Sequence, residues 1–174
     1  MISEELSTRK VRAARTRQAI LDSALDILRE KGEEQISLRG IGRQIDYSAA
    51  AIYEYFNNKE ELLTALTAMV GTQLNQVMLA ALQGIEDPQE QLLELGLAVV
   101  NFSVHNANAY KFFSSRPFSP EMIDPNGDCD GSSFMILVDV LKNCIQTGSL
   151  PKPDKLSVFE LAMACWAVVH GLAS

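Results

Sequence analysis

Apolar residues recur at the three- and four-residue spacing of an α-helix along nearly the whole 174-residue chain. Between residues 16 and 31, for example, this spacing gathers one apolar face, formed by Ile20, Leu21, Ala24, Leu25 and Leu28. No stretch of four to eight residues alternates convincingly between apolar and polar side chains, as a half-buried β-strand would. The sequence therefore predicts an all-α protein.

The composition is that of a folded, water-soluble protein, but its charges are unevenly divided. Residues 1–60 hold ten basic and ten acidic side chains, whereas residues 61–174 hold five and twelve and carry the whole net charge of −7. That net charge, taken alone, argues against nucleic-acid binding. Residues 9–17, however, contain no acid and five cations: Arg9, Lys10, Arg12, Arg15 and Arg17. This asymmetry keeps a nucleic-acid interface near the N-terminus under consideration.

Capping and turn signals divide the first third of the chain into short elements. Residues 1–15 are polar and lack a sustained apolar face, so we expect a flexible basic arm there. A helix from about Thr16 is expected to end at Gly32. Ser37 and Ser48 then each precede a short apolar pattern and are expected to act as N-caps. Residues 37–56 thus form two short helices joined by a tight turn.

The remainder of the chain is predicted to form longer helices. Asn58, with Glu61 three residues later, is a capping-box variant that begins a helix running to about Gln83. We expect further helices over 88–105, 132–147 and 154–172, a short helix capped by Asn108, and a loop over 114–131, which is rich in proline.

The second short helix has a narrow N-terminal end. Ser48, Ala49 and Ala50 add almost no side-chain bulk, which is the shape that lets a helix approach base edges in the major groove of DNA. Alternatively, these small residues simply permit close helix packing. Donors that can hold phosphate oxygens surround this end and favour the DNA interpretation: Arg39, Arg43, Tyr47 and Tyr53.

Lys59 is the most informative single residue. A lysine in the first turn of a helix opposes the helix dipole, at a cost of up to about 1 kcal/mol. A DNA phosphate beside this helix end would offset that cost. The alternative is a solvated lysine balanced by Glu60 and Glu61.

The segment from Arg17 to Leu66 resembles the DNA-binding region of the TetR family of bacterial transcriptional regulators. The resemblance rests on an ordered set of residues: Gly32, Ser37-Leu38, Ile41, Ser48, Ile52-Tyr53-x-Tyr55-Phe56 and Lys59-Glu60-x-Leu62. It implies a three-helix DNA-binding domain over 16–62, with its helix-turn-helix at 37–56, and a larger helical ligand-binding and dimerisation domain over 63–174.

The resemblance also implies roles for single residues. Tyr53 and Lys59 would clamp phosphates, and Ser37 and Tyr47 would lie near the DNA backbone. The bases would be faced by Ser48, Ala49 and Ala50. Two positions depart from the family pattern, since members often have glycine where Asp46 stands and alanine-like packing where Gly42 stands. We therefore expect a slightly less stable helix around Gly42.

The C-terminal region resembles one class of TetR C-terminal domains. Trp166, His170 and Gly171 are similar to its tryptophan–histidine–glycine signature, and 108–113 is similar to its short middle helix. Such domains usually have one more helix beyond the position of Ser174, so a domain lacking its last helix is expected. The resemblance implies an apolar ligand pocket with polar handles, whose candidate residues could equally be ordinary core residues: Asn101, Phe102, His105, Tyr110, Phe113, Met135, Trp166 and His170.

Other kinds of site find little support. Cys129, Cys144 and Cys165 form no metal-binding spacing, and neither histidine has a glutamate three residues before it. No catalytic motif stands out, so neither an enzyme, a metal site nor a cofactor is expected. The longest apolar run spans nine residues, 161–169, which predicts no membrane partner and a cytoplasmic protein.

Taken together, the sequence predicts a DNA-binding transcriptional regulator. By the resemblance it is a ligand-responsive repressor that binds a palindromic, double-stranded operator as a homodimer and responds to a small-molecule effector. The alternative is a helical small-molecule sensor or interaction module without DNA binding.

Overall fold

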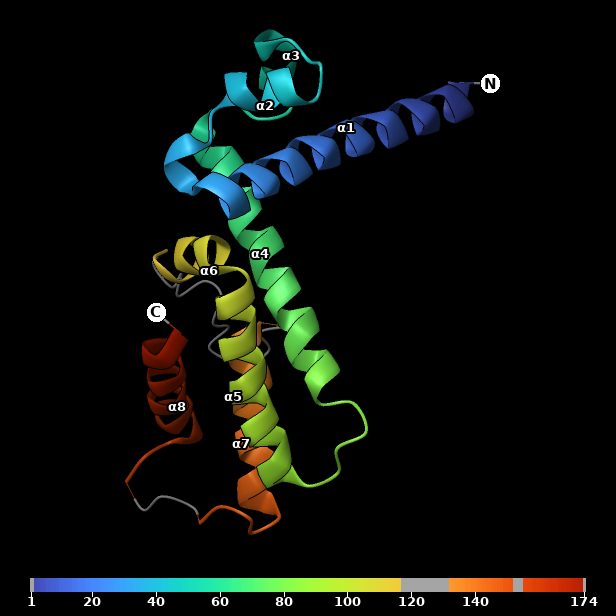
Figure 1. The fold of residues 1–174 in the computed structure, drawn as a ribbon. Coiled ribbons are helices and arrows are strands. Elements are labelled where there is room, and N and C mark those ends of the chain that lie inside the picture. The colour runs from blue at the N-terminus through green and yellow to red at the C-terminus, as the bar shows by residue number, and fades with distance from the viewer. Residues whose placement is uncertain (1, 117–131, 152–154, 174) are drawn as a thin grey trace. The chain divides into compact units, whose positions relative to one another are not determined.

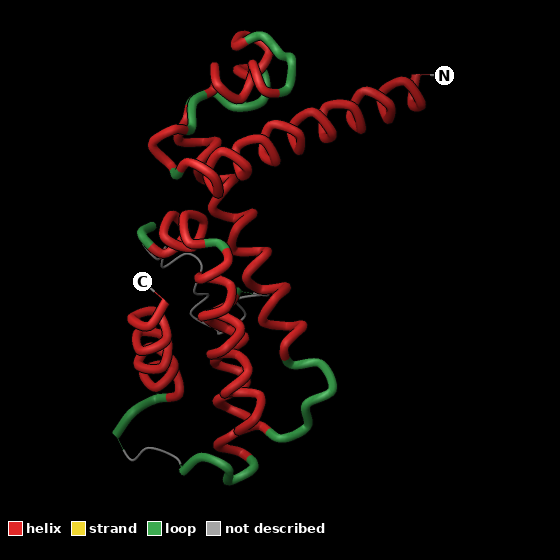
Figure 2. The backbone as a smooth tube through the Cα atoms, in the orientation of Figure 1, coloured by secondary structure: helices red, strands yellow, loops and turns green. Residues whose placement is uncertain are grey.

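The computed structural model describes residues 2–116, 132–151 and 155–173. Every regular element in these ranges is a helix, as Figure 2 shows, which confirms the predicted all-α class. The chain divides into two compact units, Met1–Met69 and Val70–Ser174, called here unit 1 and unit 2. The division lies inside helix α4 (Lys59–Ala81), slightly beyond the boundary after residue 62 that the sequence predicts.

Unit 1 contains a long helix, a short 3-10 turn and two short helices before α4 begins. These are α1 (Ile2–Lys31), η1 (Glu33–Gln35), α2 (Leu38–Gln44) and α3 (Ala49–Tyr53). Helix α2 packs on both α1 and α3. The fully buried side chains are almost all large and apolar: Ile20, Ala24, Leu28, Ile41, Ile52, Phe56, Leu62 and Leu66. Neither short helix has enough apolar surface to be stable alone, so this shared core is what holds α3 in place.

Helix α1 begins at Ile2, so the predicted start near Thr16 is wrong (Figure 1). Residues 2–15 contain no glycine or proline, and most are good helix formers. A helix nucleated by the packed residues from Ile20 onward can therefore extend toward the N-terminus by adding one hydrogen bond per residue. Residues 9–15 are exposed, so the expected basic segment lies on a helix surface.

In its described residues, unit 2 consists of the C-terminal part of α4 and four further helices. These are α5 (Pro88–His105), α6 (Ala107–Ser114), α7 (Ser133–Gln146) and α8 (Val158–Ala173). Helices α5, α7 and α8 pack on one another, and α5 also packs on α6. One cluster of their core is formed by Phe134, Met135, Leu137, Val138, Leu141 and Ala162.

Two helix starts in unit 2 differ from the prediction. Asn106, not Asn108, is the N-cap residue of α6. Helix α8 begins at Val158, where Ser157 Oγ accepts from the Glu160 N–H at 3.2 Å and the Glu160 carboxylate accepts from the Ser157 N–H at 2.7 Å. This reciprocal capping box explains the start. The predicted start at 154 and most of the predicted 114–131 loop lie outside the described residues.

Helix α4 is long and apolar enough, by length and composition alone, to cross a membrane. One third of the relevant window is buried inside the structure, including Leu62, Leu66 and Leu74. Core helices pass this test as readily as membrane helices do. The absence of a membrane partner stays a prediction.

Candidate nucleic-acid interface

Serine hydroxyls fix the N-termini of both short helices. Ser37 Oγ accepts a hydrogen bond from the Gly40 N–H at 3.1 Å, and Ser48 Oγ accepts one from the Ala51 N–H at 3.1 Å. Each bond satisfies a backbone donor that the helix leaves unpaired, a contribution of about 1 kcal/mol. Both predicted N-caps are confirmed. Both serine side chains remain exposed beside the helix ends.

The turn between α2 and α3 depends on two backbone features. Asp46 has a φ of 58°, a left-handed conformation that aspartate tolerates better than most residues. The Tyr47 N–H donates to the Gly42 carbonyl oxygen at 2.8 Å, and a Cβ on Gly42 would lie 2.7 Å from the Tyr47 carbonyl oxygen. The glycine is therefore required by the close approach of the turn, and its cost in helix propensity is offset by that fit.

Helix α3 buries one side and exposes the other. Ile52 is fully buried, whereas Ala50 is exposed and Ala49 is half-buried. Tyr53, three residues after Ala50 and therefore on the same face, is 53% exposed. The helix has five residues and ends at Tyr53, so the second of the two short helices predicted within 37–56 is shorter than expected. Its outward face is narrow at the start and carries a tyrosine at the end.

Exposed hydrogen-bond donors flank this face. Tyr47 in the turn is 42% exposed, and its hydroxyl lies 3.5 Å from Thr16 Oγ1 of α1. Arg39 and Arg43 on α2 are also exposed. All nine predicted DNA-contact residues belong to unit 1; eight of them are exposed, and Ala49 is half-buried.

Lys59 is the first residue of α4 and is exposed. Asn58 Oδ1 accepts from the Glu61 N–H at 2.8 Å, as the capping box predicts. The Glu61 carboxylate, however, accepts from the backbone N–H and side-chain amide of Asn57, both at 2.8 Å, instead of from Asn58. Within the described part of the chain Lys59 forms no ion pair, so its ammonium group is available to an external anion.

One contact in unit 1 was not predicted from the sequence. The Arg17 guanidinium lies over the Phe56 ring at 4.8 Å from its centroid. The sequence places Arg17 simply in the basic cluster. The contact joins α1 to the segment after α3, far away along the chain, so no local spacing reveals it.

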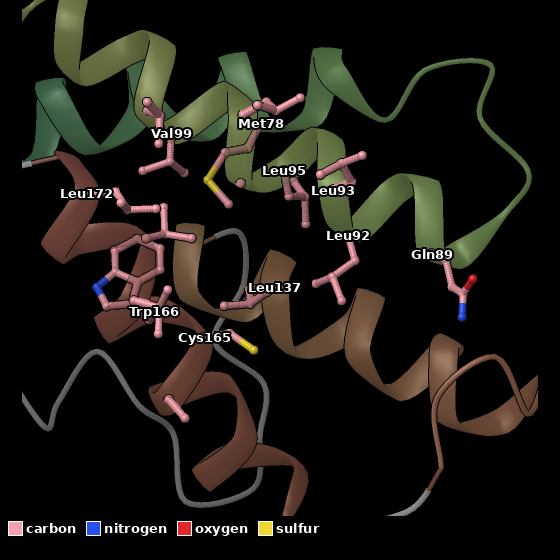
Figure 3. Close-up of a pocket in the computed structure, with 16 residues that line it drawn as sticks. Met78, Gln89, Leu92, Leu93, Leu95, Val99, Leu137, Cys165, Trp166 and Leu172 are labelled. Carbon is pink, nitrogen blue, oxygen red and sulfur yellow. The ribbon is translucent and has the colours of Figure 1, made fainter.

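Unit 2 contains an apolar groove of about 630 Å³ along α5 and α8 (Figure 3). Trp166 lines it, but the other seven predicted pocket residues do not: Asn101, Phe102, His105, Tyr110, Phe113, Met135 and His170. The α5 wall of the groove ends at Val100, so the predicted residues 101–105 lie beyond it. Seven of the eight predicted residues therefore do not belong to this groove, and the pocket expected around them stays a prediction.

The predicted polar handles make other contacts. His105 and Asn101 are exposed, and the His105 Nδ1 lies 2.8 Å from the Asn101 carbonyl oxygen. His170 Nδ1 lies 3.1 Å from the Tyr110 hydroxyl, and burial raises the pKa of that tyrosine. Among the described residues, no group of three or more histidine, cysteine, aspartate or glutamate side chains could hold a metal ion.

Comparison with known proteins agrees with this geometry. Residues 20–66 match the sequence model of the bacterial regulatory proteins of the tetR family. The chain is 37% identical over 71 residues to a nicotine-responsive HTH-type transcriptional repressor of Paenarthrobacter nicotinovorans, covering 41% of this chain and only 37% of that protein's length. It is 27% identical over 140 residues to an uncharacterised HTH-type regulator of Bacillus subtilis, covering 77% of this chain and 72% of that protein.

Solved structures share the fold over most of the chain. A Rhodococcus sp. RHA1 protein of unknown function has a TM-score of 0.75 at 21% identity, covering 90% of this chain and 80% of that one. The TetR-family regulator PfmR of Thermus thermophilus has a TM-score of 0.63 at 22% identity, covering 88% and 84%. The match to the tetR-family model thus falls on the segment that builds α2 and α3, and the chain shares its fold with TetR-family structures over most of its length.

Proposed function

We propose that the protein is a sequence-specific DNA-binding transcriptional regulator, and that it acts as a ligand-responsive repressor. In this proposal two copies bind a near-palindromic operator, and each inserts α3 into one major groove. An effector that favours the conformation with weaker DNA affinity would release the operator. No catalytic step is part of this function.

The observation that carries the proposal is the exposed face of unit 1. The N-terminal end of α3 presents only small side chains at Ser48 and Ala50, so base edges can come close to it. Tyr47, Tyr53 and Lys59 are exposed around it and supply donors for phosphate oxygens. The family match over residues 20–66 covers this same face.

The alternative, a helical sensor without DNA binding, has less support. At the N-terminus of α4 the positive charge of Lys59 interacts unfavourably with the helix dipole. A bound DNA phosphate would offset that cost, whereas a protein that does not bind DNA has no such phosphate. The relatives are themselves described as transcriptional regulators.

The decisive experiment measures operator affinity against salt. Operator fragments are first selected from genomic DNA, and their dissociation constants are then measured by fluorescence anisotropy. With about 6–10 phosphate contacts per dimer, we expect affinity to fall roughly 10³- to 10⁵-fold between about 50 and 200 mM salt.

Lys59→Ala tests the phosphate contact directly. We expect weaker binding to all sequences and a salt slope reduced by about one for each subunit bound. Lys142→Ala is the matched control, since Lys142 is an exposed lysine of unit 2 that pairs with Asp139 at 3.2 Å. An unchanged slope in the Lys59 variant contradicts the assignment. Failure of the wild-type protein to select any DNA contradicts the function as a whole.

A further inference from the structure

The groove of unit 2 has walls of a single chemical kind. Its rim is formed by exposed aliphatic side chains of α5 and α8, namely Leu93, Leu97, Val168 and Leu172. The exposed fractions of these four residues range from 45% to 73%. Single exposed leucines are ordinary, but several around one concave surface are typical of a binding site.

The floor of the groove reaches the hydrophobic core of unit 2. Met78 of α4, Leu95 of α5 and Leu137 of α7 line it, and each is at most 7% exposed. Figure 3 shows these side chains directed toward the space beside α8. A volume of about 630 Å³ lies within the ~300–1,000 Å³ range of small-molecule sites. This depth favours a compact small molecule, because a second helix laid across the rim would leave the floor unfilled.

No described residue of the groove carries a charge. The side-chain amide of Gln89 stands at one end (Figure 3), where it donates to the Ser149 carbonyl oxygen. The Cys165 thiol also lines the groove, and burial raises its pKa. A charged ligand group held against these walls would lose its hydration without gaining a partner. None of the acidic side chains of residues 61–174 is among the described lining residues, so the lining offers no carboxylate that would favour a cationic ligand.

We propose that the groove along α5 and α8 binds an uncharged, hydrocarbon-rich small molecule. The inference deepens the ligand response of the proposed function and rests on that function for any effect on DNA. Binding itself is measured without DNA, so its failure is distinguishable from a failure of operator recognition.

The protein carries its own reporter for this site. Trp166 is the single tryptophan of the chain and lines the groove. The full-length protein is titrated with N-phenyl-1-naphthylamine, an uncharged probe, and energy transfer from Trp166 is recorded. The matched anionic probe is 1-anilinonaphthalene-8-sulfonate, which adds one sulfonate to the same ring system. We expect saturable transfer to the neutral probe and at least roughly tenfold weaker binding of the sulfonate.

Paired variants on the exposed side of α8 locate the site. Ala164 and Ala167 are both exposed, but only Ala164 lines the groove. Ala164→Glu therefore brings a carboxylate to the groove, and we expect it to weaken the neutral probe by roughly tenfold or more. Ala167→Glu adds the same charge to the same helix and is expected to leave binding unchanged. Neither change disturbs the core, so loss of binding is not loss of folding.

Three outcomes overturn the proposal. The first is the absence of saturable transfer, and the second is equal or tighter binding of the sulfonate. The third is competition with self-association. In that case the affinity for the neutral probe falls as the protein concentration rises, and sedimentation velocity shows the protein self-associating over the same concentration range. That last result assigns the groove to a second copy of the chain. The combination of neutral preference, Ala164 sensitivity and Ala167 insensitivity supports the proposal.

Discussion

Gly42→Ala tests the structure of the helix-turn-helix most sharply, because two effects of opposite sign compete at this position. Gly42 lies within α2, where alanine is favoured over glycine by about 1 kcal/mol from helix propensity alone. A Cβ at this position, however, would meet the Tyr47 carbonyl oxygen at 2.7 Å. That neighbour is backbone, so it cannot rotate away as a side chain could.

The clash is expected to win. Overpacking typically costs about 1–3 kcal/mol, and moving Tyr47 also strains the hydrogen bond from its N–H to the Gly42 carbonyl oxygen, worth about 1 kcal/mol. After subtracting the propensity gain, we expect a net loss of about 1–3 kcal/mol. For a chain of this size, each kcal/mol corresponds to a shift in Tm of about 2–4 °C.

Urea unfolding followed by far-UV circular dichroism measures the change. Gly171→Ala in α8 is the control, because a Cβ there has no neighbour within 4 Å and only the helix-propensity gain remains. We expect that control to be more stable than the wild type by about 0.5–1 kcal/mol. A Gly42→Ala protein that is also more stable than the wild type would refute the account of the turn.

Two further predictions concern a turn and a helix end. Asp46→Val places a β-branched residue at a φ of 58° and is expected to cost about 1–3 kcal/mol in urea unfolding, whereas Asp46→Gly is expected to lie near the wild type. Hydrogen bonds from the Ser157 N–H and hydroxyl lower the pKa of Glu160, so the ionised carboxylate stabilises the start of α8. That contribution is present above the unfolded-state pKa of a glutamate and is lost as the pH falls through the lowered folded-state pKa. NMR titration is expected to show the Glu160 pKa rising in Ser157→Ala, and an unchanged value contradicts the capping-box account.

Local features of the fold were predictable because their causes are local. Ser37 and Ser48 cap short helices through bonds that span three residues, so spacing alone identifies them. The start of α1 was missed because helix propagation out of a packed segment does not require an apolar face of its own. The groove was also missed, because its walls are set by how α5 and α8 approach each other. Gly96, for example, faces Val169 across that approach, and nothing in the surrounding spacing indicates it.

The two candidate sites bind their ligands through different forces, electrostatic for DNA and apolar for the groove. Binding at the two sites is therefore expected to depend differently on ionic strength. The face of α3 is flanked by exposed cations, so DNA binding releases counterions and is expected to weaken roughly 10³- to 10⁵-fold between about 50 and 200 mM salt. The described groove carries no charge, so binding of an uncharged probe displaces no counterions and is expected to change less than about twofold over the same range. Added salt slightly strengthens apolar burial, so any small change is expected toward tighter binding.

Anisotropy of labelled operator and energy transfer from Trp166 can be recorded on one sample. A neutral probe that dissociates with salt as steeply as the operator does would mean that charged side chains hold it, and the assignment of the groove to apolar ligands would then be wrong.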